Sequence, residues 1–349
     1  MSNKVKIKNL TVGGGERIAV QSMTNTDTLD TEATLNQLLE LQNAGCDIAR
    51  IAVSSEQEVN ACVPLIGKTD MPLVADIQFD YRLAVRCAEI GFDKIRFNPG
   101  NIGSEANVKR VVDACRAHAV PIRIGVNTGS LEKDLLGMPK SEALVVSALR
   151  HVALLEKFGF YDIVISVKSS DVKTTVDAYR RLSSAVDYPL HLGVTESGTD
   201  ERGVVRSAIG MGSLLLDGIG DTLRVSLSGD PVNEVHAARM ILQECGIDKD
   251  YCEIISCPTC SRCKYDLKSI VDRLKSETAG IKKRVKVAVM GCVVNGPGEA
   301  ADADFGVAGG GGDKAALFVK GNVVKSITTD EIIPTLLKLI DDKINGNEQ

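Results

Sequence analysis

Eight short runs rich in β-branched residues recur along the first two-thirds of the chain. They are residues 17–23, 47–53, 72–76, 94–98, 121–127, 162–168, 189–196 and 222–227. Most are almost continuously apolar, which is typical of parallel strands that are covered on both faces. Helical patterns separate them, and eight strand–helix units over about 245 residues match the usual size of a TIM barrel. We therefore predict an α/β protein that begins with a (β/α)8 barrel.

The segments between these runs carry signals for helix starts and stops. Residues 30–44 place leucines at helical spacing, and Gly45 follows them as a typical stop. Ser104 and Ser141 precede amphipathic segments, and we predict both as N-caps. Residues 231–245 form a further helical pattern after the eighth run, with a proline in the first turn.

The pattern changes after residue 250, where short strands and helices mix. The expected elements are a strand at 252–256, a helix at 266–278, a strand at 284–290, a hairpin at 316–327 turning at Gly321–Asn322, and a helix near 329–342. The glycines at 309–312 are not followed by the G-K-[ST] of a P-loop, so we expect a flexible loop there, with a phosphate-binding nest as the alternative. We predict a barrel domain at 1–250 and a small α+β domain at 251–349.

Composition and charge narrow the classes of function. The formal net charge of −5 argues against nucleic acid as the main partner. No apolar run reaches the length of a membrane span, and the first ten residues lack the core of a signal peptide. We expect a cytoplasmic protein with reduced thiols and no membrane contact. Six of the ten cysteines are expected to be small apolar packing residues, namely Cys46, Cys62, Cys87, Cys115, Cys245 and Cys252.

Polar side chains lie within or just after the predicted strands. They are Arg50, Asp76, Arg96, Asn98, Arg123, Asn127, Lys168, Glu196, Arg224 and Ser226. Barrel active sites lie at the C-terminal ends of the strands, so these side chains should converge. Gathering four arginines and a lysine is costly unless an anion offsets their charge, and the arginine fork suits phosphate. The alternative is that some of them form structural ion pairs with Asp or Glu.

A second candidate site lies in the C-terminal domain. Cys257, Cys260 and Cys263 follow a C-x2-C-x2-C rhythm, and Cys292 lies in the loop "GCVVNGPGEA". Such a set suits either a structural zinc ion or an iron–sulfur cluster, and composition alone leaves the two about even. Glu299 in the same loop favours a cluster with one exchangeable iron, because a carboxylate is displaced more easily than a thiolate.

Six motifs together resemble one enzyme family. They are "SCPTC", "GCVVNGPGEA", "RFNPGNIG", "RIGVNTGS", "LGVTESG" and "RVSLSGDP". Over essentially its whole length the chain resembles the 4-hydroxy-3-methylbut-2-enyl diphosphate synthases of the non-mevalonate isoprenoid pathway. The resemblance implies reductive ring opening and dehydration of 2-C-methyl-D-erythritol 2,4-cyclodiphosphate to the open allylic diphosphate, with two electrons.

The resemblance also implies roles for individual residues. A [4Fe-4S] cluster would be held by Cys257, Cys260, Cys292 and Glu299, and Glu299 would also act in catalysis. The substrate would be bound by Arg50, Arg96, Arg123, Lys168 and Arg224, with Asp76, Asn127 and Ser226 at further pocket positions. Glu196 matches the family's barrel acid, a proton donor or acceptor. Cys263 departs from the family pattern and is the alternative to Glu299 as the fourth ligand.

The same resemblance implies partners. It implies flavodoxin or ferredoxin as electron donor, and a homodimer in which each cluster domain caps the partner's barrel. Residues 257–291 carry nine Lys or Arg and three Asp or Glu, so they are either a docking surface for an acidic carrier or a solvated face. Two other classes remain, a zinc-stabilised barrel hydrolase for a phosphorylated sugar and a non-catalytic phospho-ligand binding protein with a structural metal domain. A brown anaerobic preparation would exclude both zinc-based alternatives, because zinc is colourless.

Overall fold

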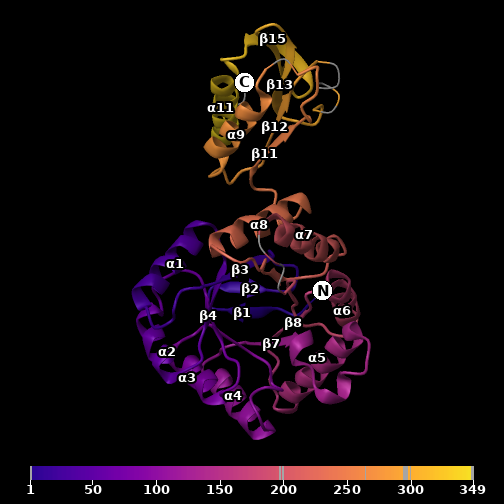
Figure 1. Cartoon of the computed structure of the whole chain (residues 1–349). Helices are drawn as coiled ribbons and strands as arrows, with labels where there is room; N and C mark the ends of the chain where they lie inside the picture. Colours follow the sequence, from indigo (N-terminus) through magenta and orange to yellow (C-terminus); the bar gives the residue numbers. More distant parts are fainter. Residues whose placement is uncertain are drawn as a thin grey trace. The chain divides into compact units, whose positions relative to one another are not determined.

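The computed structural model describes residues 2–195, 198, 200–263, 265–293, 298 and 300–346. The chain divides into two compact units, residues 1–245 and 246–349, and each encloses a hydrophobic core of its own. Figure 1 shows their elements coloured along the sequence. No helix in the described ranges is long and apolar enough to cross a membrane.

Eight parallel strands form the centre of the first unit. They are β3 (Ala19–Met23), β4 (Ile48–Ala52), β5 (Leu73–Asp76), β6 (Lys94–Phe97), β7 (Ile122–Asn127), β8 (Ile163–Lys168), β9 (His191–Leu192) and β10 (Thr222–Leu223). They pair in the order β8-β7-β6-β5-β4-β3-β10-β9, and a parallel bridge between Ile165 and Leu190 joins the two end strands. All eight predicted strands are present, and the predicted TIM barrel is confirmed.

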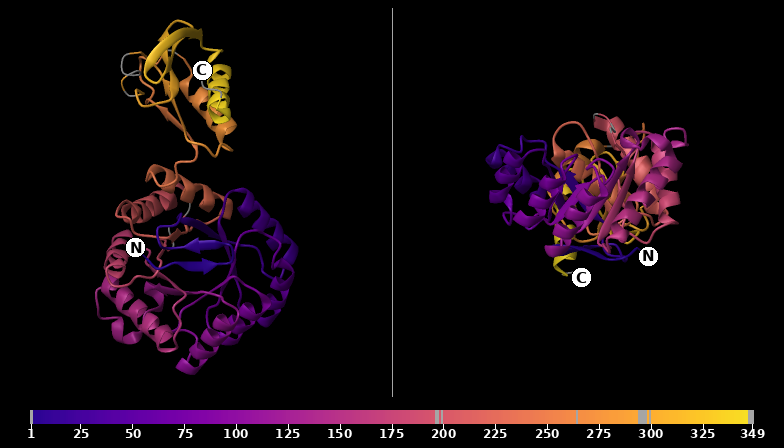
Figure 2. Two further views of the ribbon diagram at one scale, coloured as in Figure 1. Left: turned by 180° about the vertical axis from the view of Figure 1, so that it is seen from behind. Right: turned by 90° about the horizontal axis from the view of Figure 1, so that it is seen from below.

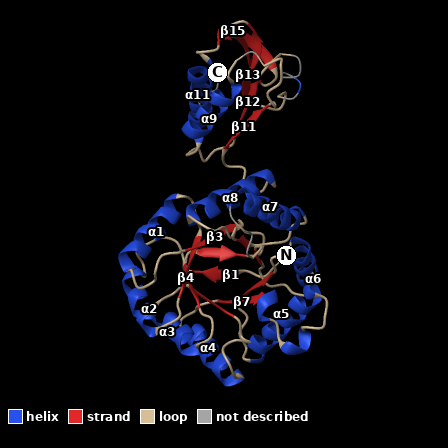
Figure 3. Cartoon of the chain, in the orientation of Figure 1, coloured by secondary structure: helices blue, strands red, loops and turns tan. Residues whose placement is uncertain are grey.

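Helices surround these strands on the outside, as Figure 3 shows in blue around red. They are α1 (Thr31–Asn43), α2 (Glu56–Cys62), α3 (Tyr81–Ile90), α4 (Glu105–Ala117), α5 (Lys140–Lys157), α6 (Val172–Ser183), α7 (Asp200–Leu216) and α8 (Pro231–Glu244). Their apolar faces and the outer faces of the strands form one continuous core. Each fully buried aliphatic side chain in such a core stabilises the fold by about 1.5–3 kcal/mol.

The helix ends test the predicted capping residues. Gly45 follows α1 with a φ of +88°, a left-handed conformation that favours glycine. Ser104 holds the N-cap position of α4 as predicted, although its side chain makes no capping hydrogen bond. The prediction of Ser141 as an N-cap is wrong, because α5 begins at Lys140 and Pro139 holds the cap position. Proline suits a helix start because its ring fixes φ near the helical value.

A short antiparallel hairpin, which we did not predict, precedes the barrel. Strand β1 (Val5–Ile7) pairs with β2 (Leu10–Val12). The hairpin packs on inward residues near the starts of the barrel strands, and this cluster comprises Val5, Ile7, Val12, Ala19, Ile48, Val74 and Val164. Figure 2 (left) shows the two indigo strands lying across one end of the barrel. The hairpin therefore covers the N-terminal end of the barrel and leaves its C-terminal end free of this contact.

The second unit is a five-stranded sheet with two helices packed on it. In order the strands are β11 (Cys252–Ser256), β12 (Val285–Met290), β13 (Phe305–Gly311), β14 (Lys314–Val319) and β15 (Asn322–Thr328). The first three are parallel and the last two antiparallel. Helices α9 (Leu267–Thr278) and α11 (Ile332–Asn345) supply leucines and isoleucines to its core. The predicted small α+β domain is confirmed.

Two local predictions in this unit need correction. The glycines at 309–312 are not simply a loop, because β13 runs as far as Gly311. A Cβ on Gly309 would lie 2.4 Å from the carbonyl oxygen of Gly291, so glycine is required where the two backbones approach. The hairpin turns at Lys320–Gly321, one residue earlier than predicted, and both residues have positive φ as a type I′ turn requires.

Candidate active site

The five predicted basic residues lie on the barrel strands or directly after them; Lys168 and Arg224 are at C-terminal ends as predicted, whereas Arg123 is only the second residue of β7 (Ile122–Asn127). Arg50 is on β4, Arg96 on β6, Arg123 on β7, Lys168 at the end of β8, and Arg224 directly after β10. The side chain of Arg224 is only 14 % exposed, and the other four are buried further. Since burial in low dielectric penalises charge, each of these cations needs a partner.

Asp76 on β5 is the partner of two of them. Its Oδ1 accepts a hydrogen bond from Arg96 Nη1 at 2.7 Å, and its Oδ2 lies 3.6 Å from Arg50 Nε. Burial opposes ionisation of Asp76, but the two arginines outweigh it and hold the pKa of the carboxyl below its ordinary value. Burial lowers the pKa of Arg50 to about 9, a shift that Asp76 offsets only in part.

Arg224 has a partner that the sequence did not reveal. Its Nε and Nη2 each donate to a carboxylate oxygen of Glu234 on α8 at 2.9 Å. Glu234 is 3 % exposed and also accepts from Ser22 Oγ at 2.8 Å and from the backbone N–H of Leu227 at 3.1 Å. In the sequence Glu234 is an ordinary first-turn glutamate, and only the fold brings it to the end of β10.

Arg123 and Lys168 have no carboxylate partner among the described residues. Arg123 is 1 % exposed, and its Nε and Nη1 lack any hydrogen-bond partner there. Burial, and then the neighbouring Arg50 and Arg96, shift the pKa of Arg123 well below its ordinary value. Burial and the charge of Arg123 do the same to the pKa of Lys168. In the described part of the chain, five cations thus face two carboxylates, and the alternative of purely structural ion pairs accounts for only some of them.

Gly125 on β7 and Gly193, which directly follows β9, each make room for a cation of an adjacent strand. A Cβ on Gly125 of β7 would lie 2.5 Å from Arg96 Nε, and a Cβ on Gly193 would lie 2.6 Å from Lys168 Nζ. Neither glycine has a positive φ, so backbone conformation does not explain their presence. Because these glycines have no side chain, the charged ends of Arg96 and Lys168 can occupy the space beside them.

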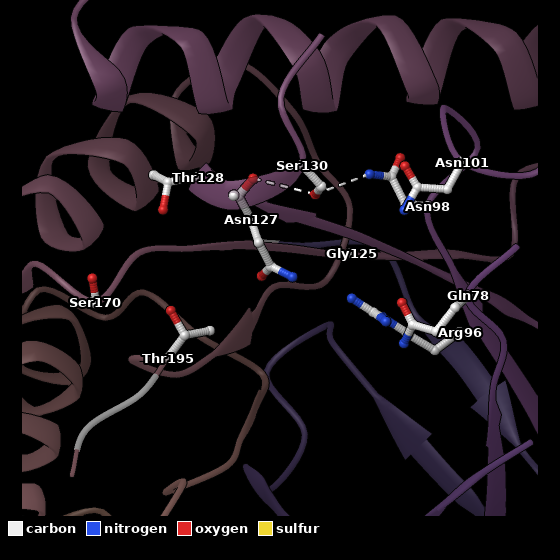
Figure 4. A pocket seen from close by; sticks show the side chains of 11 residues that line it. Gln78, Arg96, Asn98, Asn101, Gly125, Asn127, Thr128, Ser130, Ser170 and Thr195 are labelled. Atoms are coloured by element: carbon white, nitrogen blue, oxygen red, sulfur yellow. Dashed lines mark hydrogen bonds between the residues drawn. The ribbon is translucent and has the colours of Figure 1, made fainter. Parts of the chain in front are cut away.

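A pocket of about 350 Å³ opens beside Arg96 and is shown in Figure 4. It is lined by Gln78, Arg96, Asn98, Asn101, Gly125, Asn127, Thr128, Gly129, Ser130, Ser170 and Thr195. Ser130 Oγ donates to the carbonyl of Asn127 at 3.3 Å, and Asn98 Nδ2 donates to Ser130 Oγ at 3.4 Å. These side chains are hydroxyls and amides that can bind the hydroxyl and phosphate oxygens of a small polar ligand.

The pocket contains only part of the predicted substrate site. Arg96 and Asn127 line it, whereas Ser226 is half-buried after β10 and does not. Glu196 lies outside the described residues, although Thr195, which precedes it, lines the pocket. Gln78, Asn101, Ser130 and Ser170 were missed. Their only signal is a polar side chain in a loop after a barrel strand, which many surface residues share.

The second unit brings together two cysteine loops. Cys257 directly follows β11 and Cys292 closely follows β12, and these neighbouring strands are parallel, so both loops leave the same edge of the sheet. The backbone N–H of Gly291 donates to Cys257 Sγ at 3.2 Å. Cys263 Sγ lies close to the same glycine, since a Cβ there would be 2.7 Å away, and it donates to the carbonyl of Tyr265 at 3.2 Å.

The chemistry of these thiols differs from that of the other cysteines. Cys260 is exposed, and a hydrogen bond from the backbone N–H of Arg262 lowers the pKa of its thiol. By contrast, burial raises the pKa of Cys46, Cys62 and Cys115 to about 12, so they are inert packing residues as predicted. The second unit thus holds the exposed Cys260 as well as the packing residue Cys252, the pKa of which is raised by burial.

The cysteine loops fit an iron–sulfur cluster in donor type, and two of them leave the same edge of the sheet. Thiolates from two adjacent loops, with a backbone N–H aimed at one sulfur, form the kind of environment that holds and tunes such clusters. No three His, Cys, Asp or Glu side chains of the described residues are gathered at metal-binding distance. Glu299 lies outside those residues.

Comparisons with known proteins agree over almost the whole chain. Residues 2–239 match the GcpE TIM-barrel domain, and residues 253–342 match the GcpE protein C-terminal domain. The chain is 52 % identical over 343 residues to the 4-hydroxy-3-methylbut-2-en-1-yl diphosphate synthase (flavodoxin) of Clostridium perfringens, covering 97 % of this chain and 98 % of that protein. It is 53 % identical over 347 residues to the protein of the same name from Caldanaerobacter subterraneus, covering 99 % and 98 %.

Similarity to solved structures concerns the fold alone. The dihydropteroate synthase of Yersinia pestis superposes with a TM-score of 0.52 at 14 % identity, covering 70 % of this chain and 99 % of that one. This similarity supports the barrel architecture and does not bear on the chemistry.

Proposed function

Since this chain belongs to the GcpE family of 4-hydroxy-3-methylbut-2-en-1-yl diphosphate synthases, we propose that its buried barrel cations bind the diphosphate of the substrate. The enzyme is an oxidoreductase of isoprenoid biosynthesis. It opens the ring of 2-C-methyl-D-erythritol 2,4-cyclodiphosphate reductively, with two electrons and loss of water, and yields the linear allylic diphosphate.

The main support for this proposal is that cations outnumber carboxylates among the described residues inside the barrel. Arg123 and Lys168 have no acidic partner among the described residues, whereas Asp76 and Glu234 hold the remaining three cations in place. An anion with two negative charges would offset this imbalance. Arg50, Arg96 and Arg224 would complete the diphosphate site, and Asn127 and Ser226 would bind the remaining oxygens of the substrate.

The same residues would also assist bond cleavage. When the ring opens, negative charge grows on the phosphate oxygen that leaves carbon, and fixed cations beside it stabilise that charge without reorganising. We assign proton transfer near the carbon skeleton to Glu196, which resembles the family's barrel acid. Membership of the family implies an iron–sulfur enzyme. Such a cluster, when bound, supplies single electrons and a Lewis-acidic iron.

We propose a [4Fe-4S] cluster with Cys257, Cys260, Cys292 and Glu299 as its ligands. The parallel pairing of β11 with β12 and the N–H···S bond from Gly291 to Cys257 support the three cysteines. Cys263 is turned toward the carbonyl of Tyr265, which favours Glu299 as the fourth, exchangeable ligand. Release of the Glu299 carboxylate would open a coordination position, and this is the catalytic role that we propose for Glu299.

Substrate binding to oxidised enzyme tests the diphosphate site. Arg123→Ala and Lys168→Ala should each weaken the affinity by about 1.5–3 kcal/mol, the typical value of a charge-assisted contact. The visible absorbance of the cluster should stay unchanged in both variants. Lys109→Ala, an exposed lysine that pairs with Asp113, is the control. Unchanged substrate affinity in both Arg123→Ala and Lys168→Ala would contradict the proposal.

We propose that the electron donor is an acidic carrier, flavodoxin or ferredoxin. Among the described residues, Lys275, Lys282 and Arg284 are exposed on the second unit, although Lys268 and Arg273 pair with acids on their own helix. Reduction by flavodoxin should therefore slow steeply with added salt, while reduction by a small neutral reductant should not. An equal response of both reactions would exclude this docking surface.

We also propose a cytoplasmic homodimer. All ten cysteines are free, which suits a reducing compartment. On α7 and α8, the side chains of Ile209, Leu216 and Met240 are each more than half exposed and line an apolar groove of about 540 Å³. An apolar patch of this kind favours a second copy as its cover. Sedimentation should give a dimer, and Ile209→Asp should dissociate it; a monomeric wild type would refute the proposal.

A further inference from the structure

A layer of buried polar atoms inside the barrel has no hydrogen-bond partner among the described residues. These atoms are Gln21 Nε2 and Oε1, Lys94 Nζ, Arg96 Nε, Arg123 Nε and Nη1, and His191 Nε2. All belong to residues on barrel strands, and each residue is at most 8 % exposed. An unsatisfied buried polar atom costs about 1–3 kcal/mol, so the layer must be completed by water or by a ligand.

Lys94 is the unexpected member of this layer. It is fully buried at the start of β6, and its ammonium group has neither a hydrogen bond nor an ion pair in the described part of the chain. Side chains two residues apart on a strand point to the same side, so Lys94 lies on the same face as Arg96, one step further from the pocket. Lys94 is not among the residues to which the family resemblance assigns a role.

The groups around Lys94 are cationic or neutral. Arg123 on β7 and Arg50 on β4 act on it electrostatically, and it acts in turn on His191 of β9. Burial, followed by Arg123 and Arg50, holds the pKa of Lys94 well below its ordinary value. Burial, followed by Arg123, Lys168 and Lys94, holds the pKa of His191 well below its ordinary value, so the imidazole is neutral.

Lysine, rather than arginine, yields its proton in such a cluster. A guanidinium stays charged in proteins, whereas a buried lysine readily becomes a neutral amine. Asp76 does not relieve Lys94, because its two oxygens already pair with Arg96 and Arg50. Burial and the charge of Arg123 lower the pKa of Lys168 in the same way. Burial and the neighbouring cations therefore disfavour the charged form of both lysines.

We propose that Lys94 takes up a proton when the cyclic diphosphate binds, so that the barrel gains a positive charge under the anion. The proposal rests on the proposed binding of the substrate diphosphate by the barrel cations. An anion held by Arg96 and Arg123 reverses the local potential, and an opposite charge nearby favours the ammonium form. The proton comes from the buffer and becomes the third N–H of the Lys94 ammonium, and no other bond changes.

A purely structural role would give a different result. If water alone satisfied Lys94 and the substrate left its charge unchanged, binding would release or take up no proton at this residue. If the proposal holds, affinity falls as the pH rises between the pKa of Lys94 in the free enzyme and its pKa in the complex. At a pH below the pKa of Lys94 in the free enzyme, Lys94 is already charged, so substrate binding causes no proton uptake at this residue.

Calorimetry of binding measures the proton directly. The cluster-loaded, oxidised enzyme is titrated anaerobically with 2-C-methyl-D-erythritol 2,4-cyclodiphosphate, without reductant, so that no turnover occurs. The titration is repeated at one mildly alkaline pH in buffers of different ionisation enthalpy, and the slope of the observed enthalpy gives the protons taken up. Each phosphorus of this substrate carries one strongly acidic hydroxyl, so the substrate itself does not titrate in this range.

The comparison of variants isolates Lys94 from Lys168. Lys94→Met, and Lys94→Gln should the first variant fold poorly, should each take up fewer protons than wild type, by roughly one. Lys109→Met, which alters an exposed lysine of α4, should match wild type. Equal uptake by wild type and the Lys94 variants would overturn the inference while leaving diphosphate binding intact. Absence of substrate binding in wild type would instead overturn the proposed function.

Discussion

Arg96 and Lys168 occupy space that a methyl group on a neighbouring strand would fill. The would-be Cβ atoms of Gly125 and Gly193 lie 2.5 and 2.6 Å from the charged ends of these two side chains. At Gly125 the nearest atoms all belong to the flexible end of Arg96, so an added methyl group would move the cation rather than the backbone. Gly125 thus acts on binding through Arg96 and is a positioning residue.

Gly125→Ala should therefore weaken substrate binding about tenfold, equivalent to about 1.4 kcal/mol, while the thermal stability of the enzyme changes little. Gly193→Ala should act similarly through Lys168, with some loss of stability because its Cβ would also approach the carbonyl of Arg224 at 3.0 Å. Calorimetric affinity and melting temperature separate the two effects. Gly129→Ala is the control, since Gly129 lines the pocket but a Cβ there meets nothing within 4 Å. Normal affinity in Gly125→Ala would contradict this role.

Single residues differ in how far the sequence predicted them. Arg50, Arg96 and Arg123 were predictable, because a charged residue inside an apolar strand run is unusual and demands a partner. Glu234 and Lys94 were not, for opposite reasons. Glu234 has the sequence context of a first-turn glutamate on a covering helix. Lys94 begins its strand, where a lysine ordinarily reaches solvent, and only barrel closure buries it completely.

At the scale of elements, continuous apolar runs predicted all eight barrel strands. The β1–β2 hairpin was missed because each strand has only three residues, too few for a periodic signal. In hindsight its alternation is regular, since Val5 and Ile7 are buried on either side of the exposed Lys6. The extent of β13 was misjudged because glycine usually breaks strands, whereas here it permits close approach of backbones.

The hairpin should contribute substantially to the stability of the barrel. Ile7 is fully buried against the inward residues of the strands, so Ile7→Ala should lower the free energy of unfolding by about 2–5 kcal/mol. Lys6→Ala, on the exposed side of the same strand, should change it little. Denaturant unfolding followed by circular dichroism measures both variants. Similar free energies of unfolding for Ile7→Ala and Lys6→Ala would show that the hairpin does not stabilise the barrel.

At the scale of the molecule, the two units divide the chemistry between them. The first unit holds the buried cations and the polar pocket, and the second holds the cysteine loops. Sequence motifs predicted this division, because a barrel pattern and a cysteine pattern occupy separate stretches of the chain. Sequence motifs could not predict the balance of charge inside the barrel, because that balance depends on which carboxylates the fold brings to the cations.

The iron and acid-labile sulfide content of the anaerobically purified chain tests the central claim most directly. We expect a brown protein with four of each per chain in wild type and in Cys263→Ser, and loss of both in Cys257→Ser, Cys260→Ser and Cys292→Ser. Glu299→Ala should retain part of the cluster without turnover. A colourless zinc protein, or a Cys263→Ser variant without iron beside a fully active Glu299→Ala variant, would contradict the account.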